Sequence, residues 1–111
     1  MNTSENKIEN KRATDPIDQL IFEEGLRIKK LWIDKDLDLI IVLLNNKKLL
    51  KRPLSDFKSL EHASLIQLED YENDGTGIHW PQLDEDLSLR GFLKYELARM
   101  DAPLGKLTLF N

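Results

Sequence analysis

The segment "LDLIIVLLNNKKLLKRPL", residues 37–54, decides the fold of this chain. Its first half is apolar on both faces of an extended strand, and such a strand belongs in the middle of a sheet, covered on each side. Asn45-Asn46 predicts a tight hairpin turn, because asparagine tolerates positive φ. Pro53 ends the next strand, since proline has no N–H for the ladder. The two faces of the first strand carry Leu39, Ile41 and Leu43, and Ile40, Val42 and Leu44.

The segment before this hairpin supplies a third strand. In "LRIKKLWID", residues 26–34, apolar residues recur two or four positions apart, which is typical of a half-buried strand. The acidic "DKD" at 34–36 then forms a turn, so we predict a meander of three antiparallel strands. Asp15 as N-cap, Pro16 and a stop at Gly25 predict a short helix upstream, although the isoleucine and phenylalanine of that segment also suit a strand.

The segment "GTGIHWPQLDEDLS", residues 75–88, predicts a short fourth strand and the start of a helix. Its two glycines form a turn, Ile78 and Trp80 face the core, and His79 lies on the opposite face. We expect Asp84 or Asp86 to cap the following helix, because carboxylates bind the free N–H groups of a first helical turn. An apolar stripe runs along that helix, formed by Leu89, Phe92, Leu93 and Leu97.

A second helix is predicted over residues 64–71, where Ser64 and Gln67 have the spacing of a capping box. The resulting fold class is α+β, with a small antiparallel sheet of a three-strand meander plus a short fourth strand, packed against short helices. We divide the chain into a flexible polar tail (1–15), a single α+β domain (16–100) and an apolar C-terminal segment (101–111).

Composition limits the location and the partners of the protein. The chain of 111 residues has no cysteine and a net charge of −4, and its longest apolar run is far shorter than the ~20 residues that span a bilayer. We therefore expect a cytoplasmic protein without a membrane partner, and the charge lowers the expectation of nucleic-acid binding.

No set of residues has the pattern of a catalytic site. The two histidines, His62 and His79, are far apart in sequence, and no nucleophile or positioned acid accompanies them. The aspartates at 34, 36 and 38 have the spacing of a calcium loop, but Leu39 and Asn45 occupy the positions where it requires Gly and Glu. We predict no catalytic residue, no metal and no cofactor, and a metal-dependent hydrolase using His79 is the remote alternative.

Two groups of residues are candidates for binding. The C-terminal Leu107, Leu109 and Phe110 are too apolar for a free tail, and "KLTLF" has the chemistry of a strand. Docking onto the chain's own core and pairing with a partner strand are equally open for this segment. Four basic residues form the second group and could contact nucleic acid from the sheet: Lys29, Lys47, Lys51 and Arg52.

The segments "LDLIIVLLNNKKLLKRPLSDF" and "GTGIHWPQLDEDLSLRGFL" resemble the bacterial domain-of-unknown-function family 2442, over roughly residues 27–97. The resemblance implies a compact α+β fold with an antiparallel sheet and no established catalytic residues. It also implies that relatives are fused to a helix-turn-helix domain or paired with a second small protein in a toxin–antitoxin-like arrangement. We expect no helix-turn-helix here, because too few residues follow Met100.

Two functions follow from these observations. The first is a non-enzymatic protein-interaction module, antitoxin-like or an adaptor, that binds another chain or itself through Leu107, Leu109, Phe110 and His79. The alternative is a nucleic-acid-binding or transcription-regulatory accessory protein that uses the four basic residues.

Overall fold

A computed structural model describes residues 15–100 of the chain. The chain begins with a short helix α2 (Pro16–Asp18) that continues as a π-helical turn η1 (Gln19–Glu23). The first sheet, sheet A, follows as β1 (Ile28–Asp34), β2 (Leu39–Leu44) and β3 (Leu49–Pro53). Three short helical segments come next, namely η2 (Leu54–Asp56), α3 (Lys58–Glu61) and α4 (Leu65–Glu69). The second sheet, sheet B, and the last helix are β4 (Glu72–Asn73), β5 (Gly77–Trp80), β6 (Glu85–Ser88) and α5 (Leu89–Arg99).

The α+β class and the three-strand meander are confirmed. Sheet A has the order β1-β2-β3 with antiparallel pairing throughout, and β2 is its middle strand. The predicted fourth strand is β5, but it does not join sheet A. It is the middle strand of a separate antiparallel sheet with the order β4-β5-β6. β4 and β6 were not expected, because two and four mostly polar residues give no readable alternation.

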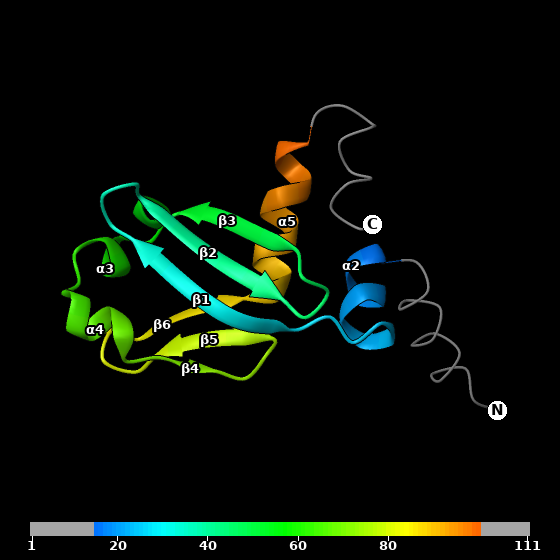
Figure 1. The fold of residues 1–111 in the computed structure, drawn as a ribbon, viewed down its shortest axis with the longest axis horizontal. Coiled ribbons are helices and arrows are strands. Elements are labelled where there is room, and N and C mark those ends of the chain that lie inside the picture. The colour runs from blue at the N-terminus through cyan, green and yellow to red at the C-terminus, as the bar shows by residue number, and fades with distance from the viewer. Residues whose placement is uncertain (1–14, 101–111) are drawn as a thin grey trace.

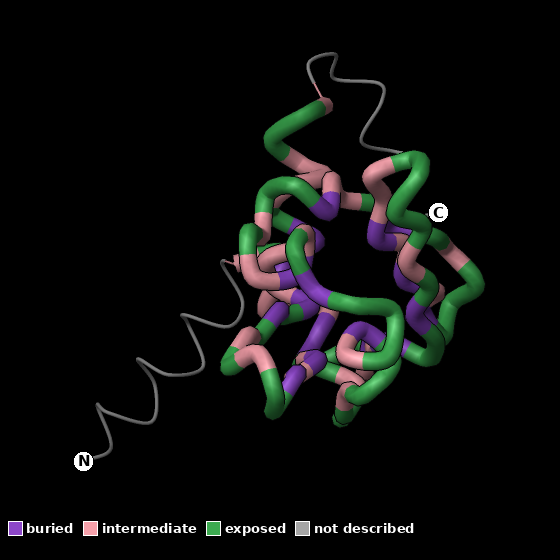
Figure 2. Tube along the Cα trace, turned by 90° about the vertical axis from the view of Figure 1, so that its left-hand side faces the viewer, coloured by how far each residue is buried: buried purple, intermediate pink, exposed green. Residues whose placement is uncertain are grey.

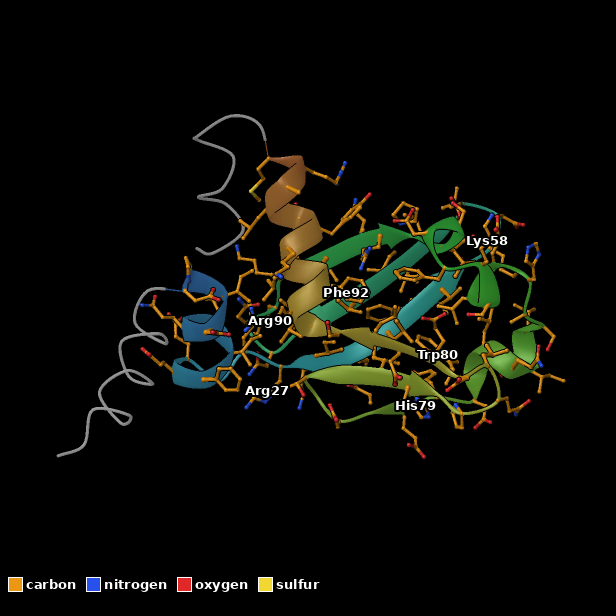
Figure 3. The ribbon with its side chains drawn as sticks, turned by 180° about the vertical axis from the view of Figure 1, so that it is seen from behind. Arg27, Lys58, His79, Trp80, Arg90 and Phe92 are labelled. Carbon is orange, nitrogen blue, oxygen red and sulfur yellow. The ribbon has the colours of Figure 1, made fainter. Side chains whose placement is uncertain are left out.

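The core lies between the two sheets. In Figure 1, α5 and β6 lie behind sheet A, and in the reverse view of Figure 3 they lie in front of it, so both cover the same inner face. Figure 2 shows buried positions on the inward sides of the chain. The indole N–H of the fully buried Trp80 donates to the backbone oxygen of Leu68 at 3.0 Å, which ties β5 to α4. The apolar stripe of α5 is confirmed by the burial of Leu89, Phe92 and Leu93, with Leu97 partly buried.

The N-terminal helix is fixed by caps and by an ion-pair cluster. As predicted, the Asp15 carboxylate accepts the N–H of Ile17 at 2.9 Å, and Gly25 follows the helix with φ 71°. Arg90 of α5 pairs with Asp15 at 3.5 Å and also with Asp18, so the helix is anchored to α5. The capping box that begins α4 at Ser64 is confirmed as well.

The hairpin turn between β2 and β3 forms where it was predicted, but for a different reason. The residue with positive φ is Lys47, at 74°, and not one of the two asparagines. Asn45 instead binds the segment before β1. Its side-chain oxygen accepts the N–H of Arg27 at 2.9 Å, and its amide group donates to the oxygen of Gly25 at 3.0 Å.

The prediction that Asp84 or Asp86 caps the last helix is wrong. Ser88 is the N-cap of α5, and its hydroxyl accepts the N–H of Gly91 at 2.9 Å. Asp84 lies in the turn before β6 with φ 50°, and Asp86 belongs to β6 itself. Acidic residues suit both a helix cap and an exposed strand position. Here the cross-strand pairing of Leu87 with Ile78 places Asp86 in a strand and not at the start of the helix.

Replacing the observed cap should separate these two assignments. We expect Ser88→Ala to lower the free energy of unfolding by about 1 kcal/mol, because one N–H of the first turn of α5 loses its acceptor. Asp84→Asn should change it by less than about 0.5 kcal/mol, because Asp84 is exposed and asparagine tolerates its positive φ. Urea denaturation of both variants provides the test, and a larger loss for Asp84→Asn than for Ser88→Ala would contradict the assignment of Ser88 as the cap.

Candidate functional site

The outer face of sheet A is unusually apolar. Register and burial place nine side chains on it in three cross-strand rows, and the middle column is entirely aliphatic. Solvated faces of antiparallel sheets are normally polar. The rows are Lys30–Leu43–Leu49, Trp32–Ile41–Lys51 and Asp34–Leu39–Pro53.

No described helix crosses this outer face, and α5 only borders one end of it, where Tyr95 and Arg99 share a hollow with Leu39 and Pro53. The side chains of Trp32 and Leu49 are 48% and 55% exposed, and the middle column is only partly buried. In Figure 1 none of the helices from residues 15–100 crosses in front of β1–β3. The expectation that both sides of β2 are covered is therefore wrong for the described residues. A continuous apolar run shows that a strand has two apolar faces, but it does not show what lies against each face.

The four basic residues proposed for nucleic-acid binding are not gathered on this face. Only Lys51 belongs to the three rows. Lys29 lies in the irregularity between Ile28 and Lys30, and Lys47 lies in the hairpin turn. The register thus places Lys30, and not Lys29, beside the apolar column.

Arg52 points to the other side of β3 and is held by aromatic rings. Its guanidinium carbon lies 4.7 Å from the ring centroid of Phe57, 4.9 Å from that of Tyr95 and 5.8 Å from that of Phe92. It also pairs with Asp56 at 3.8 Å. This side chain joins β3 to α5, so its role is structural and it is not available to a ligand on the outer face.

A groove runs beside the free edge of β1 and is named here the β1–α4 groove. It has a volume of about 220 Å³ and is lined by Leu31, Trp32, Ile33, Leu65, Leu68, Glu69 and Tyr71. Leu65 of α4 is 64% exposed at this groove, and the next residue, Ile66, is 77% exposed. Trp32 borders both the groove and the outer face of sheet A, so the two surfaces are continuous.

His79 lies on the outer side of β5, opposite the buried Trp80, as predicted (Figure 3). Its Nδ1 lies 2.6 Å from a carboxylate oxygen of Asp86, and register places Glu72 on its other side. The three side chains border a shallow hollow of about 360 Å³ on sheet B. Within residues 15–100, no three histidine or acidic side chains are grouped so as to hold a metal ion.

The apolar residues Leu107, Leu109 and Phe110 lie outside the described residues, so their role stays a prediction. The surface residues that the sequence did not single out are Trp32, Ile41, Leu49 and Leu65. For the first three, the apolar residues on both faces of β2 and on its neighbouring strands could have indicated an exposed apolar surface. Leu65 gave none, because the capping box that contains it indicates where the helix begins but not which residues are covered.

Two three-stranded antiparallel sheets around one core, with α5 across the inner face of sheet A, define a small α+β protein. Residues 28–98 match the family described as "Protein of unknown function (DUF2442)", and the chain belongs to this family. The match confirms the resemblance found in the sequence. Among curated proteins, no sequence matches the chain significantly.

Two solved structures are similar to the chain. A crystal structure of a protein of unknown function from Rhodospirillum rubrum is 36% identical, with a TM-score of 0.53, over 64% of this chain and 88% of that chain. A solution NMR structure of an uncharacterised protein from Chromobacterium violaceum is 25% identical, with a TM-score of 0.57, over 93% of this chain and 94% of that chain. Both proteins are bacterial.

No helix between residues 15 and 100 combines the length and the apolar character needed to cross a membrane.

The turn that leads into β5 contains a titratable group with a shifted pKa. Backbone N–H groups of Thr76 and Gly77 donate to the Asp74 carboxylate at 2.9 and 2.8 Å. These bonds favour the charged form and hold the pKa of Asp74 below its ordinary value. The charged carboxylate therefore stabilises the turn on which β5 depends.

We expect wild type to be more stable than Asp74→Asn at neutral pH, and the difference to disappear in acid. The folded-state pKa lies below the unfolded value of about 3.9, so the contribution is complete above that pH and is lost as pH falls through the folded pKa. Urea midpoints of both proteins across this range measure it. Asn keeps an acceptor oxygen but does not titrate, so a difference that is constant with pH would contradict the prediction.

Proposed function

We propose that the protein is a non-enzymatic interaction module of the cytoplasm, an adaptor or antitoxin-like component, that binds a partner protein through the outer face of sheet A. The observation that carries the proposal is the exposed apolar sheet face, in which Trp32 and Leu49 flank an aliphatic column. Exposed apolar patches with a polar rim mark interaction sites on proteins. A partly exposed tryptophan in such a patch is a frequent hot spot.

The arrangement of charges indicates what kind of partner fits. Lys30 stands at one corner of the three rows and Lys51 at the β3 end of the middle row, with Asp34 as the single acidic side chain in the rows. A partner surface with an apolar centre and carboxylates at its rim matches this pattern. The two lysines also discourage nonspecific pairing, because an edge strand or face that carries charge resists aggregation.

Nucleic-acid binding is the alternative, and one observation favours it. Trp32 lies next to Lys30 along β1 and in one cross-strand row with Lys51, with Ile41 between them, and an aromatic ring on a face that carries cations can stack on an unpaired base. Against it, Arg52 is withdrawn to α5 and the net charge is −4. Binding of single-stranded RNA or DNA that weakens steeply with salt would support this alternative.

Partner binding can be tested by co-expressing the tagged protein with the product of its chromosomal neighbour and weighing the complex by native mass spectrometry. We expect a hetero-complex that weakens at least roughly tenfold with Leu49→Glu or Lys51→Glu, because each places an acidic group on a face that meets carboxylates. Lys58→Glu is the matched control. It makes the same charge change at an exposed position of α3, outside the three rows.

A hetero-complex that tolerates both outer-face variants would contradict this docking surface. The absence of any complex with the neighbour would contradict the antitoxin-like form of the proposal. Circular dichroism of each variant confirms that the fold is retained, which we expect because Leu49 and Lys51 are exposed.

A further inference from the structure

The edge of β1 that faces away from β2 is open to another strand. Among the described residues, β2 is the strand that pairs with β1. On the other edge of β1, the backbone bond goes from Ile28, the first residue of β1, to the turn before β5. Alternate residues of an antiparallel edge strand direct N–H and C=O groups away from their own sheet. Such an edge is a template for strand addition.

The β1–α4 groove lies along this edge and offers what an added strand requires. Strand addition gains affinity from main-chain hydrogen bonds and specificity from pockets for alternate side chains. The groove supplies apolar side chains from both walls, Ile33 from β1 and Leu65 and Leu68 from α4. Its charged residue is Glu69.

The C-terminal segment of the chain has a sequence that matches this groove. In "KLTLF", residues 106–110, Leu107 and Leu109 fall on one side of an extended chain and Thr108 on the other. The charged residue next to the leucines is Lys106, which is opposite in sign to Glu69. Apolar spacing and charge are therefore both complementary to the groove.

The position of α5 favours the segment of a second copy. α5 packs against β3, at the opposite edge of sheet A from β1, as Figure 1 shows. Residues that follow Met100 in the same copy would have to cross sheet A to reach its β1 edge. The same residues of a second copy can approach that edge from outside the sheet. Reciprocal exchange between two copies also gives a closed dimer, which leaves neither β1 edge open.

We infer that the β1–α4 groove binds residues 106–110 of a second copy as an added β-strand, with Leu107 and Leu109 in the groove. The inference deepens the proposed interaction function by naming one partner and its site. The groove shares Trp32 with the outer face of sheet A, but its other lining residues lie outside the three rows, so the two can fail separately.

The mass of the full chain in solution, measured by light scattering after size exclusion, gives the first test. We expect a dimer for the wild type, and dissociation at least roughly tenfold easier for Leu65→Asp and for Leu109→Asp. Leu37→Asp is the matched control, since Leu37 is 67% exposed in the β1–β2 turn and does not line the groove. Because Leu65 is itself exposed, its substitution leaves the core intact.

A mixture of two defective variants gives the sharper test. Leu65→Asp has a damaged groove and an intact segment, whereas Leu109→Asp has an intact groove and a damaged segment. The two variants have equal masses, so one of them is uniformly labelled with ¹⁵N before mixing. We expect native mass spectrometry of the mixture to show a heterodimer more abundant than either homodimer, because only the mixed pair retains one undamaged exchange. Emission of Trp32, in the groove, should shift to shorter wavelength when this pair forms.

A monomeric wild type, or a dimer that Leu65→Asp leaves unchanged, would overturn the inference. A monomer whose Trp32 emission shifts to longer wavelength in Leu109→Asp would identify the segment of the same copy as the occupant, which also overturns it. The outer-face variant Leu49→Glu separates this inference from the proposed function. It should leave the dimer intact while it weakens the hetero-complex.

Discussion

The structure depends on one constraint, the two apolar faces of β2. This strand is paired on both edges, so its backbone is satisfied and only its side chains remain to be covered. Its inner residues Ile40 and Val42 are fully buried against sheet B and α5. Its outer residues are only partly buried, and of the described elements only the end of α5 borders one of them, Leu39. The inner side chains of β2 form part of the core, and its outer side chains leave a surface that is suited to binding.

The helix α5 packs beside β3 and away from β1. Arg52 of β3 lies among Phe57, Phe92 and Tyr95, and this stacking holds α5 next to β3. Gly91 leaves room for the helix cap, because a Cβ atom there would lie 3.1 Å from the Ser88 hydroxyl, whereas its distance of 3.5 Å from the Arg52 guanidinium would be an ordinary contact.

The sequence predicted the parts of the fold that local pattern controls. The continuous apolar run at residues 39–44, with a turn on each side, was sufficient for the meander, and the spacing of Ser64 and Gln67 was sufficient for α4. β6 escaped prediction because its single buried residue, Leu87, acquires its role only by pairing with β5. The candidate surfaces were not predicted from the sequence for a related reason. Whether an apolar residue such as Trp32 is covered depends on where distant elements pack, and no local pattern contains that.

Trp32 links the two proposed interactions. Its ring belongs to the outer face of sheet A and to the β1–α4 groove, so a strand in the groove fixes the side chain that a partner on the outer face contacts. Ordering this ring costs conformational entropy. The ligand that binds first orders it, so the second ligand loses less entropy when it binds. Linkage makes the effect reciprocal, because a dimer that strengthens partner binding must be strengthened by the partner to the same degree. The shared tryptophan therefore gives self-association a direct route to influence partner binding, through a single side chain and without any change of fold.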